Sequence, residues 1–196
     1  PWVTGAAHAD TIVVGAECED GRQIIIVVPT HIPGVKIVPP DQLVAFSSSQ
    51  TSRVNFEKVE VDTKWLLAGP VQNVMGRRIS GQTGGYQTST LALGLARAAI
   101  EFILAESQSR EDLVLPAEAL KSQWYKLREI LLNSVSGRQV SDAEYLRQEC
   151  NSLVLRATQS SLVIAKGTGF LSSHPAGRWC REALFFLVWS SPRSLI

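Results

Sequence analysis

The hydrophobic pattern of the chain changes its period near residue 70, and this change limits the fold more than any other sequence feature. Before residue 70, β-branched residues form short runs at 11–14, 24–28 and 35–38, separated by turn residues. A nearly alternating segment follows at 54–61, with a one-residue slip after Phe56 that predicts a bulge. Several short strands at close spacing, with no helical pattern between them, indicate antiparallel β-structure.

The second part of the chain has a helical period. Four helices of roughly 15–25 residues joined by short loops predict an antiparallel bundle. The fold class we predict is therefore α+β, with a partial antiparallel β-domain at 1–70 and an antiparallel four-helix bundle at 71–196. The expected helices cover residues 88–109 and 116–136, and two more begin at 141 and 174.

Capping signals support these helix limits. Pro116 suits a first turn, and Gly137 suits the position just after a helix end. Ser141 and Glu144 have capping-box spacing, and His174 with Pro175 opens the last helix. Small residues on the first helix, Gly94, Ala96, Ala98 and Ala99, would permit close helix packing. The inward-facing residues that we expect on the four helices, in chain order, are Leu91, Leu95, Phe102 and Ile103; Leu120, Trp124, Leu127 and Leu131; Leu146, Cys150, Leu153, Ala157 and Ile164; and Trp179, Ala183 and Phe186.

Composition excludes several classes of protein. A formal net charge of +1 argues against a nucleic-acid-binding protein, which needs a basic face. Three distant cysteines, Cys18, Cys150 and Cys180, suit free thiols in a reducing compartment, so we expect a cytoplasmic protein. The longest apolar run, 183–189, is too short to span a bilayer. Because the chain opens at Pro1 in apparent strand sequence, we expect a piece of a longer protein.

The residues alone point to no catalytic site. The histidines His8, His31 and His174 are widely spaced, and no Cys/His pairing has zinc-ligand spacing. The sequence lacks a G-x-S-x-G elbow, a Walker phosphate loop and an H-E-x-x-H motif. The segment 166–169 resembles a phosphate loop, but its lysine precedes the glycines, so it is typical of a helix end.

The order of these pieces resembles the acyl-CoA dehydrogenase superfamily. A strand with Trp2 and Thr4 followed by glycine, a Val-x-Phe-x-x-Val-x-Val segment at 54–61 and a helical bundle occur in that order. Residues 156–186 look like the last two helices of the superfamily, including Lys-Gly-Thr-Gly-Phe and Arg-Glu-Ala-Leu-Phe-Phe. The resemblance covers essentially the whole chain and corresponds to the second half of a member, from the end of the middle β-domain through the C-terminal helical domain.

The resemblance implies an FAD site. Trp2 matches a residue that packs on the flavin, and Thr4 one that hydrogen-bonds near flavin N5; alternatively, Trp2 is a core residue and Thr4 an ordinary strand residue. Arg110 matches an arginine that reaches the FAD pyrophosphate of a neighbouring subunit, although an arginine at a helix C-terminus is also favourable for the helix dipole. Gly167 and Gly169 match glycines near the partner's FAD adenosine. A homodimer or homotetramer is therefore expected.

The positions that carry the catalytic base in relatives hold no carboxylate here. Removing a substrate α-proton needs a base, yet the two matching positions are Ser190 and Gly84. Glu182 is the nearest acid, and its counterpart in the superfamily is structural. The catalytic residues therefore stay unknown, and no metal site is predicted.

Three functions remain open for a protein with this sequence. The first is α,β-dehydrogenation of an acyl-CoA thioester, with an electron-acceptor flavoprotein as a candidate partner. The second is a flavin-dependent monooxygenase of the same superfamily acting on another small molecule. The third is a non-catalytic oligomerisation or binding module. The fragment alone is expected to be inactive.

Overall fold

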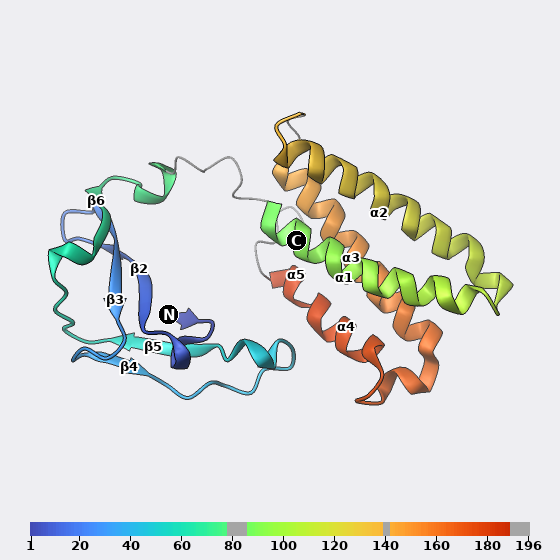
Figure 1. Cartoon of the computed structure of the whole chain (residues 1–196), viewed down its shortest axis with the longest axis horizontal. Helices are drawn as coiled ribbons and strands as arrows, with labels where there is room; N and C mark the ends of the chain where they lie inside the picture. Colours follow the sequence, from blue (N-terminus) through green and yellow to red (C-terminus); the bar gives the residue numbers. More distant parts are fainter. Residues whose placement is uncertain (78–85, 139–141, 189–196) are drawn as a thin grey trace. The chain divides into compact units, whose positions relative to one another are not determined.

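The computed structural model describes residues 1–77, 86–138 and 142–188 (Figure 1). The chain forms two compact units, residues 1–81 and 82–196. Antiparallel strands make up the first unit and helices the second, so the predicted α+β class is confirmed. Strand β6 (Leu66–Val71) crosses the predicted domain boundary at residue 70.

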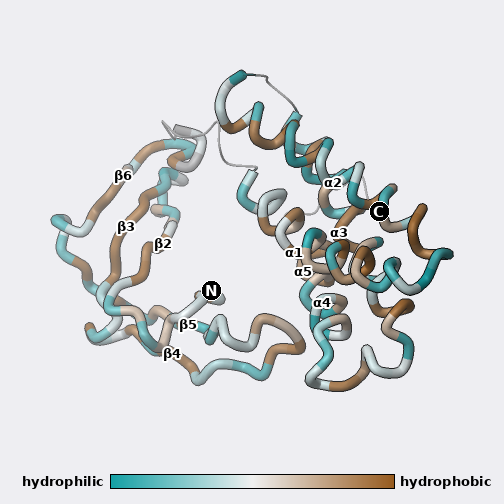
Figure 2. Tube along the Cα trace, turned by 45° about the vertical axis from the view of Figure 1, so that its right-hand side comes forward, coloured by the Kyte–Doolittle hydropathy of each residue, from teal (hydrophilic) through white to brown (hydrophobic). Residues whose placement is uncertain are grey.

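One sheet of the β unit has the strand order β2-β3-β6. Strands β2 (Thr11–Glu17) and β3 (Gln23–Pro29) pair antiparallel along their whole length. The tight turn between them needs the positive φ of 79° at Gly21, a conformation that glycine adopts without strain. Strand β3 is hydrophobic along most of its length (Figure 2), because it lies between β2 and β6 in the middle of the sheet.

The second sheet has the order β1-β5-β4, from strands β1 (Trp2–Val3), β5 (Ser52–Phe56) and β4 (Val35–Ile37). All neighbouring strands run antiparallel. The buried apolar residues of this unit include the cluster of Ala6, Ile12 and Val54, and Val28 and Val74 are buried as well. The segments between and after the strands contain short 3-10 helices. These are η1 (Ala6–His8), η2 (Ser47–Ser49), η3 (Thr63–Trp65) and, after β6, η4 (Val74–Arg77).

The strand predicted over 54–61 ends earlier than expected. Strand β5 stops at Phe56, and the prediction of a bulged continuation through Val61 is wrong. The backbone of Glu57 instead donates its N–H to Gly34 O at 2.9 Å. Lys58 has a φ of 49°, and this left-handed conformation ends the extended strand. The alternating apolar residues after Phe56 therefore belong to a loop, in which Val59 and Val61 are half-buried.

The helical unit contains α1 (Tyr86–Ser107), α2 (Val114–Val135), α3 (Ala143–Ala165), α4 (Pro175–Ala183) and α5 (Phe185–Val188). Figure 1 shows the three long helices packed side by side with α4 beside them, and α1 contacts α2, α3 and α4. The apolar core is contributed by all five helices. It comprises Ala92, Leu93, Ala96, Ala99, Ile100, Ile103, Ala117, Leu120, Leu127, Leu131, Leu146, Cys150, Leu153, Val154, Ala157, Ala183 and Phe186.

Most of the predicted inward faces are confirmed, but the start of α1 is not. Leu91 is 60% exposed, and a Cβ at Gly94 would meet no atom within 4 Å. The buried stripe of α1 instead begins at Ser89 and continues through Ala92, Ala96 and Ala99. Small side chains along this stripe let α3 approach closely. The prediction that Ala96 and Ala99 pack closely is therefore confirmed, and the prediction that Leu91 faces inward is wrong.

The helix ends differ from the predictions at one point. Pro116 lies in the first turn of α2, and Gly137 has the positive φ of 70° that a position after a helix end favours. Helix α3, however, is capped by Asp142, whose carboxylate accepts the Glu144 N–H at 2.9 Å. The predicted cap, Ser141, lies outside the described residues. Asp142 is itself a favoured N-cap residue.

The last helix is shorter than predicted. Helix α4 covers nine residues, and α5 follows after a break at Leu184. The N–H groups of Leu184 and Leu187 bond to carbonyls three residues earlier, which tightens the helix there. Phe186 is still buried as predicted. Its carbonyl accepts from the side-chain amide of buried Asn151 at 2.9 Å, which attaches α5 to α3.

Helix α1 is long and apolar enough, by length and composition alone, to cross a membrane. Its stripe of buried residues, from Ser89 to Ile103, packs inside the bundle instead. A core helix of a bundle passes the same test, so packing accounts for its apolar character.

Candidate functional site

Trp2 lies on the surface of the β unit. Its side chain is 54% exposed, so the structure does not support the alternative that Trp2 is a core residue. The guanidinium of Arg53, its cross-strand partner, lies 5.3 Å from the indole centroid. This cation–π contact holds one face of the ring in place. An exposed flat ring with a fixed orientation is suited to stacking against a planar ligand.

Thr4 follows β1 directly, and its side chain is exposed. Its Oγ1 lies 3.3 Å from Thr51 Oγ1, which in turn lies 2.8 Å from Ser49 Oγ. Gly5 donates its N–H to Ser49 O at 2.9 Å and fixes the chain at this point. A chain of three hydroxyls therefore ends at Thr4 on the surface, where a hydroxyl can donate to an acceptor.

Arg110 links the α1–α2 connection to the end of α3. Its Nη1 donates to Ile164 O at 3.3 Å, and its Nη2 lies 3.7 Å from an Asp112 carboxylate oxygen. The positive charge of Arg110 therefore lies at the C-terminus of α3 rather than at the C-terminus of α1. This position is favourable for the dipole of α3. The side chain is 31% exposed, so part of the guanidinium faces solvent.

The two candidate glycines lie in the 3-10 helix η7 (Lys166–Phe170), directly after α3 ends. The interpretation of this segment as a helix end is confirmed. Gly169 is buried, and a Cβ there would lie 2.7 Å from Leu162 Cδ1 and 3.1 Å from Ala165 Cβ. A Cβ at Gly167 would meet nothing within 4 Å. Packing therefore requires Gly169, whereas Gly167 presents open backbone.

The structure brings Arg110 to the same end of the bundle as Gly167 and Gly169. Arg110 bonds to Ile164, which lies three residues before Gly167. Trp2 and Thr4 belong to the β unit and form a second group there. Ser190 and Gly84, the positions that match the base in relatives, lie outside the described residues.

Glu182 is engaged in an ion pair. Its carboxylate oxygen lies 3.7 Å from Arg178 Nη1, one helical turn earlier on α4, and its side chain is 18% exposed. This pairing agrees with the structural role that the resemblance implies for Glu182.

An open groove between α2 and α3 was not foreseen from the sequence. Its volume is about 600 Å³. One wall carries Arg156, whose Nη2 donates to Gln123 Oε1 at 2.7 Å. The groove is lined by Leu113, Pro116, Ala119, Leu120, Arg156, Gln159, Ser160, Val163 and Ile164.

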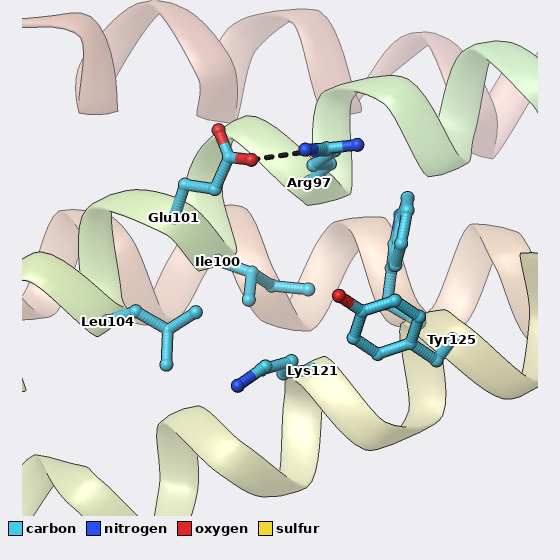
Figure 3. A pocket seen from close by; sticks show the side chains of 7 residues that line it. Arg97, Ile100, Glu101, Leu104, Lys121 and Tyr125 are labelled. Atoms are coloured by element: carbon cyan, nitrogen blue, oxygen red, sulfur yellow. Dashed lines mark hydrogen bonds and ion pairs between the residues drawn. The ribbon is translucent and has the colours of Figure 1, made fainter.

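A smaller pocket of about 80 Å³ lies between α1 and α2 (Figure 3). The hydrogen bond from Arg97 to Glu101, at 2.7 Å, raises the pKa of the Arg97 guanidinium. Lys121 is paired with Glu118 at 3.0 Å. The pocket has space for a few water molecules and not for a flavin or an acyl chain. Its charges are already paired, so it is not a candidate active site.

All three cysteines are free thiols. Burial raises the pKa of the Cys150 thiol to about 12 and also raises the pKa of Cys180, whose Sγ lies 3.1 Å from Thr158 O. Both thiols are therefore protonated at neutral pH and are poor nucleophiles. Within residues 1–77, 86–138 and 142–188, no group of three or more His, Cys, Asp or Glu side chains is placed to hold a metal ion.

The fold is that of the second half of an acyl-CoA dehydrogenase, and the resemblance expected from the sequence is confirmed by similarity over most of the chain. A probable acyl-CoA dehydrogenase of Bacillus subtilis is 25% identical in an alignment of 202 positions that covers 93% of this chain and 53% of that protein. No family model matches the chain.

Two solved structures show the same fold. Butyryl-CoA dehydrogenase of Megasphaera elsdenii has a TM-score of 0.84 at 18% identity, over 99% of this chain and 56% of that one. A glutaryl-CoA dehydrogenase of Mycobacterium smegmatis in complex with FADH2 has a TM-score of 0.77 at 19% identity, over 97% and 53%. The chain thus spans about half the length of the relatives it matches.

Proposed function

We propose that the complete protein is an FAD-dependent oxidoreductase of the acyl-CoA dehydrogenase type. The observation that carries this proposal is the similarity to a probable acyl-CoA dehydrogenase over 93% of the chain. Of the residues that the resemblance assigns to FAD, Trp2, Thr4 and Gly167 are exposed and Arg110 is partly exposed, as a binding site needs, whereas Gly169 is buried. We further propose a cytoplasmic location.

The β unit fits the flavin ring through Trp2 and Thr4. FAD supplies two-electron oxidation chemistry when it is bound. The exposed indole of Trp2, held by Arg53, would exclude water from one face of the flavin. The Thr4 hydroxyl, at the end of the chain from Ser49 and Thr51, would donate a hydrogen bond to the ring.

The helical unit fits the phosphate and adenosine parts of the cofactor. A guanidinium has five N–H donors, and Arg110 uses one of them on Ile164 O. Its Nη2 lies 3.7 Å from an Asp112 carboxylate oxygen and its side chain is 31% exposed, so Arg110 would bind a pyrophosphate through its remaining N–H groups. The open backbone at Gly167 allows a ligand to approach closely, because no side chain intervenes.

We propose that these helical residues serve the FAD of a second copy, so that the complete protein is a homodimer or homotetramer. Exposed apolar side chains occur at this end of the bundle, as a contact between copies would require. They are Leu115 at 82%, Val163 at 75%, Phe170 at 82% and Leu171 at 58%. Sedimentation of the complete protein tests the assembly, and Phe170→Glu is expected to weaken it.

The substrate we propose is an acyl-CoA thioester, with an electron-acceptor flavoprotein as the partner that reoxidises the protein. A flavin-dependent monooxygenase is the second candidate. One feature favours it: Ser190 and Gly84, the positions that the resemblance matches to the catalytic base, are not carboxylates. A serine hydroxyl accepts a proton at neutral pH only with the help of a partner base.

The first experiment is an absorbance spectrum of the purified complete protein. Bound flavin absorbs at about 450 nm. Absence of this band would support the non-catalytic module instead of an oxidoreductase. Arg110→Met is expected to reduce flavin retention. Arg138→Met, an exposed arginine after α2, is the matched control that should retain it.

The second experiment separates the two reactions. Anaerobic addition of acyl-CoA thioesters bleaches the flavin band of a dehydrogenase. A monooxygenase instead consumes oxygen only when a flavin reductase is present, and it yields a hydroxylated product. Failure to bleach with thioesters of every chain length would remove the dehydrogenase proposal and leave the monooxygenase assay to decide.

A further inference from the structure

The outward face of the β1–β5 pair carries two cross-strand pairs of side chains. Strand β1 runs antiparallel to β5, and the register places Trp2 opposite Arg53. Continued by two residues, this register places Thr4 opposite Thr51, and the 3.3 Å between their Oγ1 atoms agrees with that position. Because alternate residues of a strand share a face, the indole and the hydroxyl pair lie on the same face.

The opposite face of β5 is packed into the β unit. Ser52 and Val54 are fully buried, and Arg53 between them is exposed. A slip of one residue would bury the charged side chain and expose the apolar one, so the register of β5 is strongly specified. The hydroxyl pair is therefore held on the outward face, beside the indole.

Ser49 holds the inner end of the hydroxyl chain. Its Oγ lies 2.8 Å from Thr51 Oγ1, and both residues are half-buried. The Ser49 N–H donates to Phe46 O at 2.8 Å, and the Ser49 carbonyl accepts the Gly5 N–H at 2.9 Å. Gly5 directly follows Thr4, so backbone bonds attach the two ends of the hydroxyl chain to each other.

The direction of this hydroxyl chain is not fixed by the protein. A hydroxyl has one hydrogen and can donate or accept, so either atom of each pair can be the donor. When the hydrogen of Thr4 points outward, Thr51 donates to Thr4 and Ser49 donates to Thr51. When Thr4 accepts a bond from outside, its hydrogen turns to Thr51, and the hydrogen of Thr51 turns to Ser49. The reversal rotates three O–H groups and breaks no covalent bond.

We propose that Thr51 and Ser49 are positioning residues for the flavin, because the reversible chain that they form with Thr4 suits both oxidation states of the ring. This inference rests on the proposed oxidoreductase function. Two-electron reduction adds hydrogen to a flavin ring nitrogen, which is an acceptor before reduction and a donor after it. Thr4 would donate to the oxidised ring and accept from the reduced ring, and Thr51 would be its partner in both states.

The test compares hydroxyl deletions in the complete protein. Thr51→Val keeps nearly the same shape without the hydroxyl, Thr51→Ser keeps the hydroxyl, and Thr4→Val removes the contact to the ring. Thr30→Val is the matched control, because Thr30 is a half-buried threonine of the same unit whose Oγ1 donates to Ala9 O at 2.7 Å. For each variant we would measure the Kd of the apoprotein for oxidised FAD and the midpoint potential of the bound flavin.

Thr51→Val is expected to raise the Kd for oxidised FAD about threefold, as the loss of one neutral hydrogen bond predicts. The reduced ring loses the same support, so the midpoint potential should not change. Thr51→Ser should match the wild type. In the Thr4→Val background, Thr51→Val should have no further effect on the Kd, because the two residues act as a unit. Thr30→Val should lower the free energy of unfolding and leave the Kd unchanged.

An equal effect of Thr51→Val with and without the Thr4 hydroxyl would overturn the proposal, because Thr51 would then act through the fold. A midpoint potential that rises by about 14 mV, the value of a threefold change in one oxidation state, would show that only the oxidised ring depends on Thr51 and would refute the reversal.

If Thr4→Val does not fold, the two Thr51 variants decide: recovery of the affinity by serine supports the proposal, and failure to recover it rejects the proposal. A complete protein that binds no FAD would reject the proposed function together with this inference. FAD binding that does not depend on Thr51 would reject this inference alone.

Discussion

The β unit and the helical unit bury their apolar residues to very different degrees. The buried apolar cluster of the β unit contains only Ala6, Ile12 and Val54, with Val28 and Val74 buried outside it, while Val13 and Leu67 on its strands are 63% and 60% exposed. The helical unit has a continuous core to which all five helices contribute. Because burial of apolar area is the main stabilising term, we infer that the helical unit is the more stable of the two.

The largest effect should come from the centre of the bundle. Leu153→Ala removes a fully buried side chain of α3, and such a truncation costs about 3 kcal/mol of unfolding free energy. Chemical denaturation of the chain, followed by helical circular dichroism, measures the loss. Leu132→Ala on α2, where the side chain is 49% exposed, is the control and should change little. Equal losses in the two variants would contradict a specifically packed core.

The next effect concerns the contact between α4 and the η7 turn. In an exposed helix, alanine is favoured over glycine by about 1 kcal/mol. Gly177→Ala is nevertheless expected to destabilise the bundle by about 2 kcal/mol, because the new Cβ would lie 2.5 Å from a backbone oxygen, Gly169 O. Gly167→Ala, which meets nothing within 4 Å, is the matched control. A stabilised Gly177→Ala would show that the two backbones are further apart.

Alkaline pH should weaken the bundle through Cys150. Burial raises the pKa of this thiol to about 12, above the value of about 8.5 of an unfolded cysteine. The stabilisation from the neutral buried thiol is therefore fully present below the pKa of the unfolded state, and it is lost as the pH rises toward the pKa of the folded state. At about pH 9.5 we expect a loss of about 1 kcal/mol relative to neutral pH. The free energy of unfolding of the wild type and of Cys150→Ala, each measured as a function of pH, isolates this contribution. Parallel pH dependences in the two proteins would refute it.

The smallest effect lies on the surface of the β unit. Arg53→Met removes the cation above Trp2 and should cost about 0.5 kcal/mol, because the pair is exposed. Tryptophan fluorescence should change along with it if Arg53 orients the indole. Arg22→Met, which breaks an exposed ion pair with Asp20 elsewhere in the unit, serves as the control. If both variants leave the fluorescence unchanged, the ring is oriented by other contacts.

The sequence predicted the fold class well because both units follow simple periods. The inward positions Leu120, Leu127 and Leu131 of α2 are buried at the expected helical spacing. Errors arose where backbone conformation overrides period. The left-handed backbone at Lys58 ended a strand that the alternation continued, and tightened hydrogen bonds at Leu184 divided the last helix.

The candidate site was predictable only through the resemblance. Trp2, Thr4 and Arg110 stand at unremarkable spacings, and no local rule distinguishes a surface tryptophan from a core one. The bond from Arg110 to Ile164 O joins residues 54 positions apart, so it depends on helix packing that sequence period does not encode. The structural requirement at Gly169 follows from the same packing.

The buried amide of Asn151 has a consequence for the register in which α5 packs on α3. Its Nδ2 donates to Phe186 O, and its Oδ1 has no hydrogen-bond partner in the part of the chain that the structure describes. A leucine of similar size would avoid the cost of burying that oxygen and fit the apolar surroundings. The asparagine gives selectivity rather than strength: α5 gains a bond only in the one register that presents the Phe186 carbonyl to α3, whereas an apolar contact would tolerate sliding.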